Sequence, residues 1–110
     1  MGQICVLSDL EIPRGKQNIE HYCPKSRVPK YIWSNPCNLF PAHQVVNSIK
    51  GNLMPCEFEE KKFDLTLHAM YHWRIRFADR EFLQKTLEHW EEWHRNPCKL
   101  CLMKCGEHTR

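Results

Sequence analysis

A glutamate followed directly by a histidine, Glu20-His21, is the pair in this sequence best suited to hydrolytic chemistry. Hydrolysis of a phosphodiester needs an activated water, neutralisation of charge on the phosphoryl oxygens and help for the leaving oxygen. His21 is the natural general base, because an unperturbed imidazole has a pKa of about 6.5 and is largely neutral at pH 7. A divalent cation held by oxygen ligands can supply the other two requirements.

Oxygen ligands for such a cation are present on both sides of a proline-rich stretch. Glu20 offers a carboxylate and Asn47 an amide oxygen, the ligand types that suit Mg²⁺ or Mn²⁺. Lys50 lies three residues after Asn47, so on a helix the two share a face. Asn38 lies between Glu20 and Asn47 along the chain, where its side chain can bond backbone groups and fix the spacing of strand and helix. Glu20 and His21 converge on one ion only if their strand ends or twists there.

The elements that must position these residues can be predicted from turn residues and periodicity. Ile4–Leu7 and Leu10–Ile12 flank a turn and predict a β-hairpin, and 17–22 predicts a third extended piece. Residues 25–41 contain three prolines and predict a loop. Residues 42–50 predict a short helix that closes at Gly51.

The second half of the chain predicts two helices. The first runs from Glu59 to about Trp73, and Asp79 caps a second that ends near Arg95. Tryptophans at helical spacing are expected to pack in the core. The apolar stripes are Phe63, Leu67, Met70 and Tyr71 on the first helix, and Leu83, Leu87, Trp90 and His94 on the second, with Phe82, Thr86 and Trp93 beside them; Trp73 is expected to pack as well.

Basic residues lie between the two predicted helices. Arg74, Arg76 and Arg80 can contact phosphate, although a solvated charged edge is the commoner role for such residues. The net charge of +3 belongs to residues 1–56, which hold six Lys and Arg against three acids. That excess is compatible with a phosphate-bearing partner.

Length and composition favour one soluble domain. A chain of 110 residues is sized for a single domain, with a core at 1–56 and a helical extension at 57–110. No apolar run approaches the roughly 18 residues that span a membrane, so no membrane partner is expected. The first residues lack the basic and apolar regions of a secretory signal, which favours a cytoplasmic location with cysteines as thiols or metal ligands.

The ordered motifs resemble those of the HNH endonuclease family. They read Glu-His-x-x-Pro-Lys-Ser from Glu20, then Asn-Leu from Asn38, then Asn-x-x-Lys-Gly-Asn from Asn47. The resemblance covers about residues 4–56 and implies an α+β fold with a small ββα-metal core, a β-hairpin plus a short helix, followed here by a helical C-terminal extension.

The resemblance also implies roles for individual residues. His21 matches the general base, Glu20 the preceding acidic metal ligand and Asn38 the asparagine that structures the loop. Asn47 matches the last motif position, where family members use His or Asn, and Lys50 matches a common basic residue with a supporting role. The expected catalytic set is therefore His21, Glu20, Asn38 and Asn47, with Glu20 and Asn47 on one divalent ion.

Many small members of the family also carry a structural zinc on two Cys-x-x-Cys pairs, and this chain departs from that pattern. The first place reads Cys5-Val6-Leu7-Ser8 and the second His43-Gln44-Val45-Val46. Three interpretations stay open: a relocated Zn²⁺ site, a mixed site that borrows Cys5 or His43, and plain reduced thiols. The relocated site would use Cys98, Cys101, Cys105 and His108.

The function predicted from these motifs is metal-dependent hydrolysis of DNA. The alternative is a catalytically silent HNH-fold module that binds nucleic acid or protein. The motifs name neither the target sequence nor the mode of cleavage, and a partner protein or a homodimer can supply specificity that a chain of this size lacks.

Overall fold

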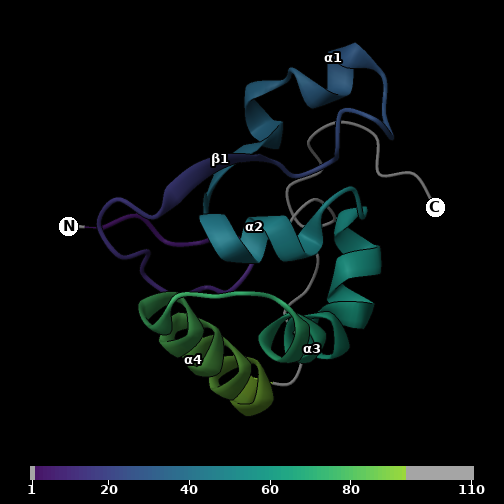
Figure 1. The fold of residues 1–110 in the computed structure, drawn as a ribbon. Coiled ribbons are helices and arrows are strands. Elements are labelled where there is room, and N and C mark those ends of the chain that lie inside the picture. The colour runs from purple at the N-terminus through teal and green to yellow at the C-terminus, as the bar shows by residue number, and fades with distance from the viewer. Residues whose placement is uncertain (1, 94–110) are drawn as a thin grey trace.

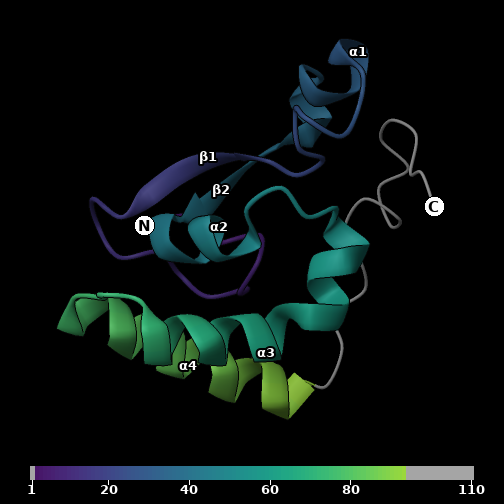
Figure 2. The same ribbon diagram turned by 45° about the vertical axis from the view of Figure 1, so that its right-hand side comes forward.

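The computed structural model describes residues 2–93, which form a mixed α and β fold. Figure 2 shows a two-stranded sheet, helix α2 beneath it, and the pair α3 and α4 below. The short helix α1 projects beyond the sheet (Figure 1). In chain order the elements are β1 Gln17–His21, α1 Lys30–Trp33, the 3₁₀ helix η1 Pro36–Asn38, β2 Leu39–His43, α2 Gln44–Lys50, α3 Pro55–His72 and α4 Phe77–Trp93.

The amino-terminal segment forms a tight loop instead of the predicted hairpin of strands. Ile4 and Glu11 make only an isolated antiparallel bridge, and the Cys5 N–H donates to the Leu10 carbonyl over 2.9 Å. Asp9 has a φ of 60°, in the left-handed region that aspartate tolerates better than most residues. The predicted turn is confirmed, whereas regular strands beside it are wrong because each piece is too short to build a ladder.

The strand pair of this fold is β1 with β2, and β2 was not predicted. The strands are antiparallel, with Gln17 opposite His43 and His21 opposite Leu39. The sequence predicted a loop over residues 25–41 because this stretch combines three prolines with serine and asparagine. The sheet has only two strands, so β2 is an edge strand, and a proline without an N–H donor is tolerated in it. Its carbonyl accepts a hydrogen bond from the Val6 N–H at 3.0 Å.

Helix α2 begins two residues later than predicted and ends where predicted. His43 caps it, because its side chain accepts a hydrogen bond from the Val45 N–H. Gly51 follows the last turn with a φ of 55°, which a residue without a Cβ adopts readily. The Gly51 N–H donates to the Asn47 carbonyl over 3.0 Å.

Helix α3 begins earlier than predicted and buries a different face. Its first turn is held by Glu57, which accepts a hydrogen bond from the Met54 N–H and pairs with Arg27 at 2.9 Å. These contacts, that with Arg27 first, lower the pKa of Glu57 to about 2. The buried face carries Phe58, Lys62, Thr66 and Ala69.

The predicted stripe on α3 is therefore wrong at two of its four positions. Leu67 is 44% and Tyr71 83% exposed. The sequence misled because α3 buries Lys62, whose ammonium lies 2.6 Å from Glu59 and 4.7 Å from the Trp90 ring. A lysine whose charge is satisfied in this way can occupy a core position that hydrophobic periodicity reads as polar.

Helix α4 buries the face that its sequence predicts. Leu83, Leu87 and Trp90 are buried, with Phe82 and Thr86 beside them. Trp90 packs edge-on against Phe58 and Phe63 of α3.

The ends of the predicted helices differ from the structure. Asp79 lies in the first turn of α4 and not at its cap, and Trp73 is 39% exposed, so the prediction that it packs in the core is wrong. His94 and Arg95 lie outside the described residues, as does the side chain of Trp93. None of the helices within residues 2–93 is both long and apolar enough to cross a membrane.

Candidate active site

Glu20 and His21 lie at the end of β1, where the strand leaves the sheet. Alternation along β1 is inverted relative to an ordinary half-buried strand, since Ile19 is 64% exposed and Glu20 only 6%. The buried carboxylate faces helix α2, whereas His21 is half-buried and has different neighbours. Because the strand exposes an isoleucine and buries a glutamate, we expect Glu20 to have a polar partner in the interior.

Lys50 is the partner of Glu20. Its ammonium nitrogen lies 2.7 Å from Oε2 of Glu20, and both side chains are buried. Burial raises the pKa of Glu20, while the charge and hydrogen bond of Lys50 and a hydrogen bond from the His21 backbone act against that rise. Sequence reasoning gave Lys50 a supporting role only, because nothing local shows that a lysine at the end of a helix is enclosed.

His21 packs against the ring of Trp33, and the face of that ring also contacts the ammonium of Lys25. Its ring centroid is 5.9 Å from that of Trp33 in an edge-on arrangement. The Lys25 ammonium lies 4.9 Å above the Trp33 ring. Partial desolvation, and then the charge of Lys25, lower the pKa of His21. The imidazole is therefore neutral at pH 7, the form that can accept a proton.

Lys25 and Trp33 were not among the predicted site residues. The only sequence indication for Lys25 was its place in the Pro-Lys-Ser motif that follows His21. Trp33 had none, because it ends α1, a helix within the stretch 25–41 that the sequence predicted as a loop. Both reach His21 through the chain between β1 and η1.

Asn38 connects the two ends of this segment through hydrogen bonds to its backbone. Its Oδ1 accepts from the Cys23 N–H at 2.7 Å, and its Nδ2 donates to the carbonyls of Cys23 at 3.0 Å and Trp33 at 3.3 Å. The Asn38 carbonyl accepts from the Tyr22 N–H at 2.9 Å. The amide thus bonds backbone as the sequence predicts for Asn38, and it joins the end of β1 to the start of β2.

Asn47 occupies the middle of α2. Its side chain is half-buried and makes no hydrogen bond to another residue of the described range 2–93. It lies three positions before Lys50, on the same side of the helix. An amide oxygen free of protein donors is available as a ligand.

Glu20 and Asn47 fit an oxygen-liganded divalent ion in chemistry and only in part in arrangement. One carboxylate and one amide suit a weakly held Mg²⁺ or Mn²⁺ completed by water and phosphate. The Glu20 carboxylate already faces Lys50, which an incoming ion must displace or share. No group of three or more His, Cys, Asp or Glu that could hold a metal occurs within residues 2–93.

The positions where the resemblance implies zinc ligands have other contacts. The His43 N–H donates to the sulfur of Cys5 at 3.3 Å. However, Nδ1 of His43 accepts from the Val45 N–H, and Nε2 lies 3.5 Å from Asp79. Both ring nitrogens face protein groups, so the described residues do not support a mixed zinc site through His43.

The other cysteines do not fit a single interpretation. Cys5, Cys23 and Cys56 form no disulfide. Cys37 is disulfide-bonded, so the expectation of thiols or metal ligands is wrong there. The relocated zinc set, Cys98, Cys101, Cys105 and His108, lies outside the described residues.

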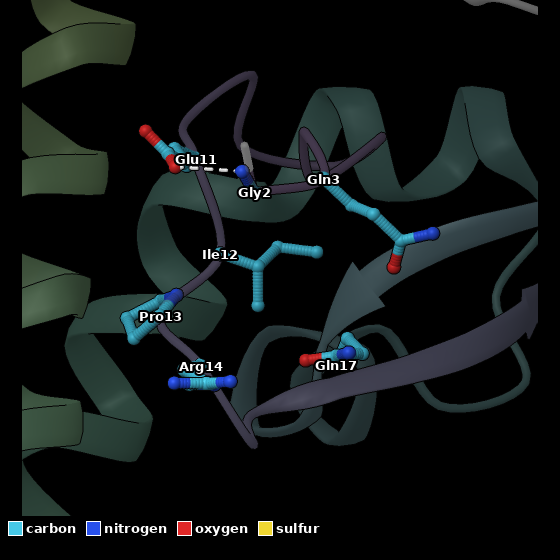
Figure 3. A pocket seen from close by; sticks show the side chains of 7 residues that line it. All are labelled: Gly2, Gln3, Glu11, Ile12, Pro13, Arg14 and Gln17. Atoms are coloured by element: carbon cyan, nitrogen blue, oxygen red, sulfur yellow. Dashed lines mark hydrogen bonds between the residues drawn. The ribbon is translucent and has the colours of Figure 1, made fainter.

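A hollow of about 570 Å³ lies away from these residues, at the amino-terminal loop. Figure 3 shows Glu11 and Arg14 among the side chains that line it, with Glu11 bonded to the Gly2 N–H at 3.0 Å. Its only acid is engaged by this contact, and it contains no residue of the predicted site. It adds nothing to the chemistry of Glu20 and His21.

Comparison of the chain with models of known protein families, with curated proteins and with solved structures finds no match.

Proposed function

We propose that this protein is a metal-dependent endonuclease of the HNH type that hydrolyses phosphodiester bonds in DNA. The observation that carries the proposal is the 2.7 Å contact between Glu20 and Lys50. It brings together two parts of the motif that are thirty residues apart in the sequence. The strand pair β1 and β2 followed by α2 has the element order of a ββα core.

In this proposal His21 accepts the proton of the attacking water. Its lowered pKa keeps the imidazole neutral at pH 7, and general-base catalysis of this kind contributes roughly 10²–10⁴-fold. Trp33 packs edge-on against the His21 ring, and Lys25 lies over the face of Trp33. Asn38 holds the end of β1, and so holds His21 relative to α2.

Glu20 and Asn47 would hold the divalent ion. When bound, such an ion neutralises charge on the phosphoryl group and assists the leaving oxygen. Burial raises the pKa of Glu20, and the charge of Lys50 opposes that rise, so Lys50 favours the ionised carboxylate that a metal ligand requires.

The test is incubation of the purified protein with supercoiled plasmid in Mg²⁺ or Mn²⁺, with conversion to nicked and linear forms measured over time. We expect His21→Ala to lower the rate by roughly 10²–10⁴-fold. His68→Ala is the matched control, because His68 is exposed on α3 and remote in sequence from the motif. Absence of cleavage with every divalent metal and DNA form, or undiminished cleavage by His21→Ala, would refute the proposal.

The Glu20–Lys50 contact also favours a second function. A carboxylate that is buried and already paired with a lysine needs no metal ion to neutralise it. A chain that uses the pair in this way would be a silent module that binds nucleic acid or protein. It would show DNA affinity that survives Glu20→Gln with His21→Ala, together with no cleavage by the wild type.

A further inference from the structure

A second polar surface lies at the amino-terminal end of helix α2. It is a hollow of about 460 Å³ between α2 and the connection of α3 to α4. Figure 2 shows that connection at the same end of the molecule as the start of α2. We call it the basic hollow and define it by Lys16, Gln44, Ser48, Trp73, Arg74 and Arg76.

The charge of the basic hollow is positive and unbalanced. Its one acid, Asp79, is buried and lies 3.3 Å from the Lys16 ammonium and 3.5 Å from His43. Arg74 and Arg76 are exposed, and neither makes an ion pair with a carboxylate in residues 2–93. Two guanidinium groups therefore face solvent with their hydrogen-bond donors free.

The same connection exposes aromatic rings. Trp73 lines the hollow and is 39% exposed, and Tyr71 and Phe77 on either side are 83% and 76% exposed. Arginines clustered on one exposed connection are the electrostatic footprint of a nucleic-acid-binding surface. A purely apolar protein partner would leave both guanidinium groups unpaired, which disfavours that occupant.

The basic hollow is close enough to Glu20 and His21 for one DNA molecule to reach both. Lys16 precedes β1 and His21 ends it, and five strand residues at about 3.3 Å each span roughly 16 Å. That length is about five base pairs of duplex at about 3.4 Å each. Ser48 of the hollow also follows Asn47 directly on α2.

We propose that the basic hollow binds the phosphate backbone of duplex DNA beside the site of cleavage. Arg74 and Arg76 each donate to a phosphate, for which the planar guanidinium is suited. The interaction supplies affinity that does not depend on sequence. The proposal rests on the proposed function in taking the bound DNA to be the substrate, and the experiment separates the two.

The experiment measures binding without cleavage. The anisotropy of a short fluorescein-labelled duplex is followed with protein in EDTA over a series of salt concentrations. We expect Arg74→Ala with Arg76→Ala to weaken affinity roughly tenfold and to reduce the slope of log K against log salt by about two. Lys61→Ala with Lys85→Ala removes two charges from exposed positions on α3 and α4 and should change neither quantity by as much.

Two further variants keep the result interpretable. Arg74→Lys with Arg76→Lys retains both charges and should keep the salt slope, so a loss confined to the alanine variant follows the removal of charge. Trp73→Phe should reduce the quenching of tryptophan fluorescence by DNA. Thermal unfolding of each variant checks that the fold is kept.

The outcomes distinguish the two proposals. DNA affinity that depends on Arg74 and Arg76 in a protein that cleaves nothing supports the basic hollow and refutes the nuclease. Plasmid cleavage with equal DNA affinity in wild type and the arginine variant refutes the basic hollow alone. Equal losses in the arginine variant and the Lys61 and Lys85 control also refute it, because the effect would then be one of net charge.

Discussion

At the scale of single residues, the Glu20–Lys50 pair is the contact on which both interpretations of the candidate site depend, the metal site and the structural ion pair. Two buried groups of opposite charge at 2.7 Å stabilise each other, but both lose hydration on folding. Removing one leaves the other buried and unpaired. The pair is thus a structural feature as well as part of the proposed metal site. Its contribution to the free energy of unfolding can be measured apart from catalysis.

We predict that Lys50→Met destabilises the protein by about 3–5 kcal/mol, because the Glu20 carboxylate stays buried without a partner. Adding Glu20→Gln should recover most of that loss, since no unpaired charge then remains. The measurement is urea unfolding of both single variants and the double variant. Lys85→Met, at an exposed position of α4, is the control. Additive effects in the double variant would contradict the pairing.

At the scale of elements, Asn38 replaces the tight turn that an ordinary hairpin would have. β1 and β2 are joined by a connection that contains α1 and η1. The Asn38 side chain bonds Cys23 and Trp33 within it, and its carbonyl bonds Tyr22. One buried amide therefore fixes both the register of the sheet and the position of Trp33 beside His21.

We predict that Asn38→Ala lowers the free energy of unfolding by about 2–4 kcal/mol, because the backbone groups of Cys23 and Trp33 lose their partner in a buried place. Plasmid cleavage should fall with it. Asn35→Ala is the comparison, since Asn35 caps η1 through the Cys37 N–H at 2.9 Å and such a cap is worth about 1 kcal/mol. Equal losses of unfolding free energy from the two substitutions would show that the hydrogen bonds of Asn38 contribute no more than an ordinary cap.

At the scale of the whole molecule, His43 joins the sheet and α2 to helix α4. Its ring stacks on Phe82 at 4.1 Å and faces Asp79 at 3.5 Å, with Lys16 on the same carboxylate. Burial lowers the pKa of His43, Asp79 acts against that change and Lys16 adds to it. The folded protein therefore holds this imidazole neutral in a range where the unfolded chain protonates it.

We predict that stability falls as pH drops below about 6.5, since the unfolded state then binds more protons than the folded state. A single such group gives a slope of at most about 1.4 kcal/mol per pH unit. His43→Gln should flatten the slope, leaving the part due to His21, whose pKa is also lowered. His72→Gln, at an exposed position, should not. Urea midpoints between pH 5 and 8 are the measurement, and an unchanged slope in His43→Gln would contradict the prediction.

The sequence by itself determined the features that depend on neighbouring residues. Gly51 predicted the end of α2, the uninterrupted stretch beyond Pro55 predicted two helices, and the period of Leu83, Leu87 and Trp90 predicted the buried face of α4. The order of Glu20, His21, Asn38 and Asn47 placed the candidate residues on a strand end, a loop and a helix. Each of these signals lies within a few residues, where local sterics and periodicity act.

Only the tertiary structure decided which distant groups meet. Strand β2 contains Pro41 and carries no strand signal, so its pairing with β1 depends on the chain between them. Lys50 is buried because Glu20, thirty residues away, neutralises it inside the fold, and Lys62 is buried against the Trp90 ring of α4. A charge is stable in the interior only when its partner is brought to it, and that partner is set by packing across the molecule.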